Sequence, residues 1–161
     1  SIVSGGTDST NTIAPNGSWY HAAVTYDSVT GTRNVYINGA LNNSQAAATG
    51  AVPSAAAMFN IGTDLCCTPA RDFNGRVDDI SLYGSGLSAS QIQQVYTAGL
   101  NNVSAANAFT AGPALGEVQQ GLVGSWNMDQ AAGTMAAGDS INGNHAVLSG
   151  ATPSTAWVPG Q

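Results

Sequence analysis

The chain has 161 residues, of which 43% are hydrophobic and only 7% charged, and its formal net charge is −6. It contains no lysine, and its three cationic side chains are Arg33, Arg71 and Arg76. The hydrophobic fraction excludes an intrinsically disordered chain, and the lack of a basic patch excludes a nucleic-acid-binding protein. No apolar run approaches the ~20 residues that span a bilayer. Abundant Gly, Ala, Ser, Thr and Asn are typical of a secreted or surface-exposed protein.

Strand patterns dominate the first part of the chain. Residues 18–27 alternate, so that Trp19 and His21 lie on the face opposite Val24. A turn at residues 27–31 leads into a second strand at residues 32–37. Asn38 and Gly39 then predict a type I′ hairpin turn, because both residues tolerate a positive φ.

Further elements follow at short intervals. The polar, alanine-rich residues 40–57 predict a loop or weak strand, residues 58–64 a short strand, and residues 73–84 an alternating strand. The pattern of residues 87–100 predicts the only helix, with Ser88 as its N-cap and Gly99 as its stop.

The last sixty residues begin with a stretch that has no clear period. Residues 101–120 contain Gly112-Pro113, which breaks helices, and we interpret them as a linker. Residues 121–129 predict a strand, and residues 140–150 a turn followed by a strand. Many short strands spaced about ten residues apart predict an all-β, two-sheet antiparallel sandwich with one short helix.

The first hundred residues resemble the laminin-G-like, concanavalin A-like sandwich (jelly-roll) domains. The resemblance rests on the order and spacing of a Trp-x-His-x-Ala strand, a Tyr-x-Asn-Gly hairpin, an Ile-Gly strand, a Gly-x-Val-Asp-Asp-Ile segment and a closing helix. The residues that carry it are Trp19, His21, Ala23, Tyr26, Asp27, Tyr36, Asn38, Gly39, Ile61, Gly62, Gly75, Val77, Asp78, Asp79 and Ile80.

Residues 121–161 resemble the opposite, N-terminal end of such a unit. The matching residues are Trp126, Asp129, Gly133, Asp139, Asn142, Gly143 and Trp157. The predicted organisation is therefore the tail of one unit at residues 1–100, a linker at residues 101–120, and the head of a unit at residues 121–161. The strands that usually lie between head and tail are missing from this order.

Three arrangements explain this order. The chain is a slice of a tandem array, or residues 121–161 fold back on residues 1–100 as in a circular permutant, or the head completes a neighbouring copy. An open sheet edge recruits a strand, which permits both the second and the third arrangement.

The resemblance implies a non-catalytic extracellular module for recognition or adhesion, with a glycan or a protein as its ligand. The alternative is a structural subunit of an extracellular filament or stalk, in which further copies of the chain are the partners. Glycoside hydrolysis requires two carboxylates that flank the scissile bond. In the glucanases of this fold, a strand with the pattern Glu-x-Asp-x-Glu supplies these carboxylates. This chain has one glutamate, Glu117, so we expect no enzyme and no catalytic residues.

The resemblance also implies a structural calcium ion near the join of head and tail strands. The matching donors are Asp139, Asn142 and one of Asp78 and Asp79, since calcium prefers carboxylate and carbonyl oxygens gathered from separate segments. The alternative for these residues is turn chemistry, in which Asp and Asn bond their own backbone.

Aromatic rings can stack on sugars, and Trp157, Tyr36 and Tyr83 are the candidates for exposed rings. Trp19 and Trp126 are expected to pack inward, and His21 is expected to be a hydrogen-bonded structural residue. Cys66 and Cys67 are adjacent, a spacing that fits ordinary disulfide geometry poorly. They form a strained vicinal ring, pair with another chain, or stay reduced in a surface loop.

Overall fold

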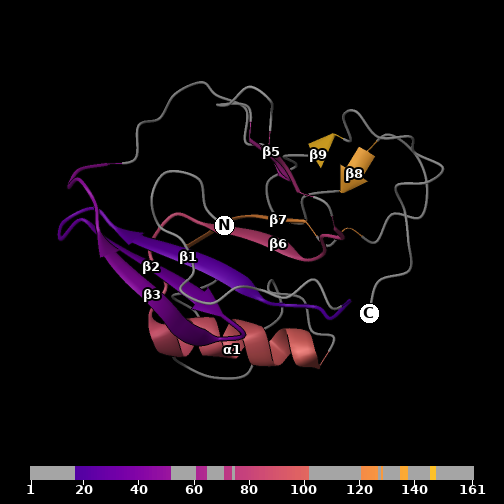
Figure 1. The fold of residues 1–161 in the computed structure, drawn as a ribbon, viewed down its shortest axis with the longest axis horizontal. Helices are drawn as coiled ribbons and strands as arrows, with labels where there is room; N and C mark the ends of the chain where they lie inside the picture. Colours follow the sequence, from indigo (N-terminus) through magenta and orange to yellow (C-terminus); the bar gives the residue numbers. More distant parts are fainter. Residues whose placement is uncertain are drawn as a thin grey trace. The chain divides into compact units, whose positions relative to one another are not determined.

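The structure is a computed structural model, and it consists of short antiparallel sheets and one helix (Figure 1). This composition confirms the predicted fold class. The residues that it describes are 17–51, 61–64, 71–73, 75–101, 121–126, 128, 135–137 and 146–147. The chain divides into two compact units, Ser1–Arg76 and Val77–Gln161.

A three-stranded antiparallel sheet forms most of the described part of the first unit. Its strands are β1 (Ala22–Asp27), β2 (Thr32–Ile37) and β3 (Ala40–Ala46), in the order β1-β2-β3. The turn between β2 and β3 is the predicted one, because Asn38 and Gly39 have φ angles of 50° and 76° and Ile37 pairs with Ala40. A short hairpin, β4 (Thr63–Asp64) with β5 (Arg71–Asp72), completes the unit's described strands.

The central strand β2 is buried on both faces. Val35 is 0% exposed and the adjacent Tyr36 is 4% exposed, and neighbouring residues of a strand point to opposite sides of the sheet. Thr25 on β1 is also buried, and its pairing partner Asn34 lies on the same face as Tyr36. A sequence pattern that marks only one apolar face could not reveal this double burial.

The second unit contains a ladder between two segments that lie far apart in the sequence. Strand β6 (Ile80–Tyr83) pairs antiparallel with β7 (Leu122–Trp126), with Ile80 opposite Trp126. The two strands lie side by side in Figure 1. A shorter pair, β8 (Met135–Ala137) and β9 (Ala146–Val147), follows. Four of the five residues of β7 are buried, and only Val123 is exposed.

Helix α1 (Ala89–Leu100) begins where its sequence predicts. The Ser88 side chain accepts the N–H of Gln91, and the Gln91 side chain accepts the N–H of Ser88, which forms a capping box. The predicted stop at Gly99 is wrong, because the helix includes Gly99 and ends at Leu100. Asn101 caps the helix instead, donating its side-chain amide to the Thr97 carbonyl at 2.8 Å and its backbone N–H to Ala98.

The approach to β6 also differs from its prediction. The alternating strand expected from residue 73 begins only at Ile80, because Asp79 has a φ of 47°, which is a left-handed conformation that no strand continues through. Asp78 and Asp79 therefore precede the strand rather than lying on its two faces.

Candidate binding surface

Two short segments close one end of the β1-β2-β3 sheet, and we call them the loop clamp: residues 27–31 and 47–51. The first is a turn organised by the Asp27 carboxylate. Its Oδ1 accepts the N–H groups of Val29 at 2.8 Å and Thr30 at 3.3 Å, and its Oδ2 accepts the Thr30 hydroxyl at 2.8 Å. Aspartate commonly bonds the backbone two residues on in this way, which fixes the turn.

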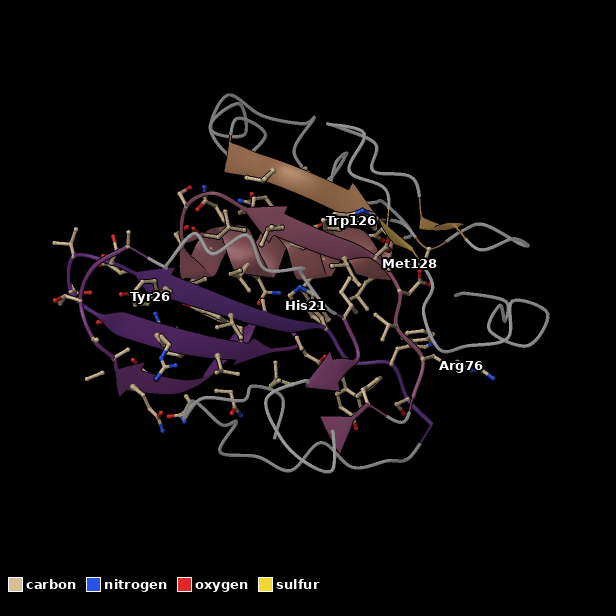
Figure 2. All side chains as sticks on the ribbon, turned by 90° about the horizontal axis from the view of Figure 1, so that it is seen from above. His21, Tyr26, Arg76, Trp126 and Met128 are labelled. Atoms are coloured by element: carbon tan, nitrogen blue, oxygen red, sulfur yellow. The ribbon has the colours of Figure 1, made fainter. Side chains whose placement is uncertain are left out.

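The second segment is fastened to the first by backbone and phenol hydrogen bonds. Ala47 N–H donates to Gly31 O at 2.6 Å, and Gly50 N–H donates to Ser28 O at 2.8 Å. The Tyr26 hydroxyl lies 2.6 Å from Ala48 O and 2.7 Å from Gly50 O. In Figure 2, Tyr26 lies at the clamp end of β1 and His21 at the other end.

Gly31 is the residue that permits this close approach. Its φ is 67°, and a Cβ there would overlap the Ala47 carbonyl oxygen. Any side chain would therefore separate the two segments of the clamp, in addition to the strain of a left-handed conformation.

The clamp presents a fixed loop surface with an apolar tip. Val29 is 84% exposed, and its neighbours Ser28 and Thr30 are also exposed. Loops that a rigid scaffold holds in place are common binding surfaces, because little ordering entropy remains to be lost on contact.

The hydrogen bonds of the clamp favour the ionised form of the Asp27 carboxyl group. The hydrogen bond from the Thr30 side chain, followed by those from the Val29 and Thr30 N–H groups, lowers the pKa of Asp27 below its usual range. A carboxyl group held ionised in this way is a poor general acid, since that role needs a raised pKa.

Only half of the predicted calcium donors can be located. Asp78 is half-buried and Asp79 exposed, and Asp78 Oδ1 accepts the Asp79 N–H at 3.1 Å. They lie at the end of the β6–β7 ladder where Met128 also has a positive φ, 53°, and Figure 2 shows Met128 beside Trp126. Asp139 and Asn142 lie outside the described residues. Within the described part of the chain, no three His, Cys, Asp or Glu side chains come together.

The predicted ligand-binding aromatics are not gathered into one surface. The expected exposure of Tyr36 is wrong, since it lies on the central strand and is 4% exposed. Tyr83 is half-buried, and its hydroxyl is buried with no hydrogen-bond partner among the residues that the structure describes. Burial raises its pKa to about 12. Trp157, Cys66 and Cys67 lie outside the described residues.

Three residues with predicted structural roles are described, and the first of them, Trp19, is half-buried. Trp126 is 7% exposed, as expected for an inward-facing side chain. The backbone N–H of His21 donates to Asn38 Oδ1 at 3.0 Å, and the backbone carbonyl of His21 accepts the Asn38 N–H at 2.8 Å. This reciprocal pair ends the β1–β2 ladder, and burial lowers the pKa of the His21 imidazole.

The loop clamp was only partly foreseeable. The Asp27 and Gly31 pair predicts the turn, but nothing in residues 47–51 marks them as its partner. Their role depends on where β3 ends, and for residues 40–57 the sequence predicts only a loop or weak strand.

Comparison with known proteins gives one family and one solved structure. A family model described as the concanavalin A-like lectin/glucanases superfamily matches residues 3–93. The chain is also similar to a crystal structure of residues 221–444 of an S-layer domain-containing protein from Clostridium thermocellum. The identity is 23% over 53% of this chain and 42% of that chain, with a TM-score of 0.43. No curated protein matches the chain.

Helix α1 is too short to cross a bilayer, and the structure offers no candidate spanning helix among its described residues.

Proposed function

Because the chain belongs to the concanavalin A-like lectin/glucanases superfamily, we propose that it is part of a non-catalytic recognition module that acts outside the cell or on its surface. The observation that carries the proposal is the loop clamp, a pre-organised surface with the exposed Val29 at its tip. The ligand class is a glycan or a protein.

Charge and composition support a contact role over catalysis. The one glutamate, Glu117, leaves no Glu-x-Asp-x-Glu strand, and the carboxylates of Asp27 and Asp78 each accept a backbone N–H group. Turnover on β-glucans, measured by release of reducing sugar, would overturn the non-catalytic assignment.

A glycan array followed by titration of the hits tests the clamp. Val29→Glu is expected to weaken binding at least tenfold, because it places a charge at the centre of the contact. Leu100→Glu is the matched control, since Leu100 is 66% exposed at the end of α1 and lies outside the clamp. Equal loss in both variants, or none in either, would show that the clamp is not the contact surface.

A structural calcium ion is proposed for the junction of β6 and β7, held by Asp139, Asn142 and one of Asp78 and Asp79. The support is the oxygen chemistry of these side chains, together with the position of Asp78 and Asp79 beside the ladder. A ligand that binds only the folded state raises its stability. Excess chelator should therefore lower the melting temperature and added calcium should restore it, whereas an unchanged melting curve in both conditions excludes the ion.

A second candidate function is assembly by strand complementation, with further copies of the chain as partners. The ladder that favours it joins β6, in the predicted tail, to β7, in the predicted head. The same pairing made between copies would link them end to end. High mass that does not change on dilution, or fibres in negative stain, would support this function, and a dilution-stable monomer would exclude it.

A further inference from the structure

The three arginines are the only side chains of this sequence that carry a permanent positive charge. Serine proteases specific for basic residues hold such a side chain on an aspartate in their specificity pocket and cut the peptide bond that follows it. A folded chain is cut where its backbone is exposed and free of hydrogen bonds, because the protease binds its substrate as an extended strand. The structure around each arginine therefore decides which bond is cut.

Two of the arginines lie within strands. Arg33 is half-buried on the central strand β2, where it pairs with Tyr26 of β1 and Gln45 of β3. Arg71 lies on β5 and pairs with Asp64 of β4. A protease reaches either bond only after the strand has left its ladder, and such local unfolding costs free energy.

Arg76 lies in a different environment. Gly75, Arg76 and Val77 belong to no helix or strand and are exposed, and Val77 is 41% exposed. None of the three makes a hydrogen bond to a residue that the structure describes. In Figure 2 the Arg76 side chain points away from the ribbon. A protease can therefore bind this segment without breaking any described ladder.

The bond after Arg76 is also the one at which the first compact unit ends and the second begins. The loop clamp belongs to the first unit, and helix α1 and the β6–β7 ladder belong to the second. Both cysteines, Cys66 and Cys67, lie in the first unit, so no disulfide within the chain can join the two. Cutting this bond leaves the clamp and the ladder on separate polypeptides.

We propose that the Arg76–Val77 peptide bond is a site of limited proteolysis, cut by a serine protease specific for basic residues. The bond that breaks joins the Arg76 carbonyl carbon to the Val77 nitrogen. Water supplies the hydroxyl group of the new Arg76 carboxyl and one hydrogen of the new Val77 amino group. The products are residues 1–76 and 77–161. This processing does not depend on the proposed recognition function, so it goes beyond it.

The preference for this bond comes from the fold and not from the local sequence. Asp78 and Asp79 closely follow the bond, and carboxylates there disfavour binding to a protease whose pocket carries a negative charge. The residue that follows Arg33 is the uncharged Asn34. In the unfolded chain, Arg33 should therefore be cut at least as fast as Arg76, whereas in the folded chain Arg76 should be cut first.

Limited digestion of the full chain with trypsin, followed by intact-mass spectrometry, tests the proposal. The first products should be residues 1–76 and 77–161, and sequencing from the amino end of the second should read Val-Asp-Asp-Ile. Arg76→Gln should slow the first cut at least tenfold, because it removes the charge that the pocket recognises. Arg71→Gln is the matched control and should leave the rate of the first cut unchanged.

Two further measurements separate recognition of this segment from a change in the fold. Arg76→Lys should keep the cut, because the aspartate of the trypsin pocket binds either cation. Digestion of the chain unfolded in urea should lose the preference for Arg76. No cut in the folded chain, a first cut at Arg33 or Arg71, an unchanged first cut in Arg76→Gln, or the same preference for Arg76 in the unfolded chain would overturn the proposal.

Discussion

At the scale of single residues, Tyr83 carries a polar group without a partner in the described part of the chain. Its hydroxyl is buried and has no hydrogen bond to any described residue, which costs free energy relative to a hydrated hydroxyl. Tyr83→Phe should therefore leave the free energy of unfolding unchanged or raise it by about 1 kcal/mol. It should also remove the loss of stability expected between pH ~10 and pH ~12, where the unfolded phenol ionises and the folded one does not.

Tyr26 provides the matched control for that substitution. Its hydroxyl bonds the Ala48 and Gly50 carbonyl oxygens, so Tyr26→Phe should lower the free energy of unfolding by about 1 kcal/mol. Urea denaturation of both variants measures the difference, and equal effects would contradict the assignment of Tyr83 as unsatisfied.

His21 predicts how stability depends on pH. Burial lowers its pKa, so as the pH falls below the usual value of about 6.5 the unfolded state takes up a proton before the folded state does. Stability should therefore be full above this pH and fall below it, until the folded imidazole also titrates. Melting curves between pH 7.5 and 5 should lose this slope in His21→Gln. Both chains in this comparison should carry His145→Gln, so that His21 is the only imidazole of the reference chain. If His21→Gln leaves the dependence of melting temperature on pH unchanged, His21 is not its source.

At the scale of elements, Gly124 determines how β7 holds its tryptophan. A Cβ on Gly124 would lie 2.7 Å from Trp126 Cη2 and 3.1 Å from Cζ2, and Trp126 is buried. Gly124→Ala should lower the free energy of unfolding by about 1–3 kcal/mol, the cost of overpacking. Gly99→Ala, in helix α1 with nothing within 4 Å, should raise it by up to about 1 kcal/mol. Thermal denaturation measures both, and destabilisation of equal size would contradict the packing argument.

Local chemistry predicted the elements whose causes lie within a few residues. The Asn38-Gly39 turn and the Ser88 N-cap depend on adjacent side chains and backbone, and both are confirmed. The start of β6 was wrong because the left-handed conformation of Asp79 has no signature in the alternating pattern around it.

Features that depend on contacts between distant segments could not be predicted from local sequence patterns. The burial of Tyr36 follows from the central position of β2 and from what covers both faces. The second half of the loop clamp depends on where β3 ends. For the site, the sequence therefore predicted the turn at Asp27 but not the segment fastened to it.

At the scale of the whole molecule, charge governs solubility. The net charge is −6 at pH 7 with no lysine to oppose the acids, and it reaches zero near the isoelectric point of 4.2. Proteins associate most readily where net charge vanishes. Light scattering against pH should therefore show a sharp solubility minimum near pH 4.2. The minimum should move to higher pH when Asp27→Asn and Asp79→Asn are combined, and a flat profile would contradict this account.

The β6–β7 ladder has a consequence for the chain during its synthesis. Ile80 leaves the ribosome well before Trp126, its partner in the ladder, so β6 lacks this partner strand while the intervening residues are translated. That interval is when a chaperone or a neighbouring nascent chain on the same messenger RNA can engage it. Rare codons placed between residues 101 and 120 would lengthen the exposure, and they offer a way to control how much of the protein reaches its native form.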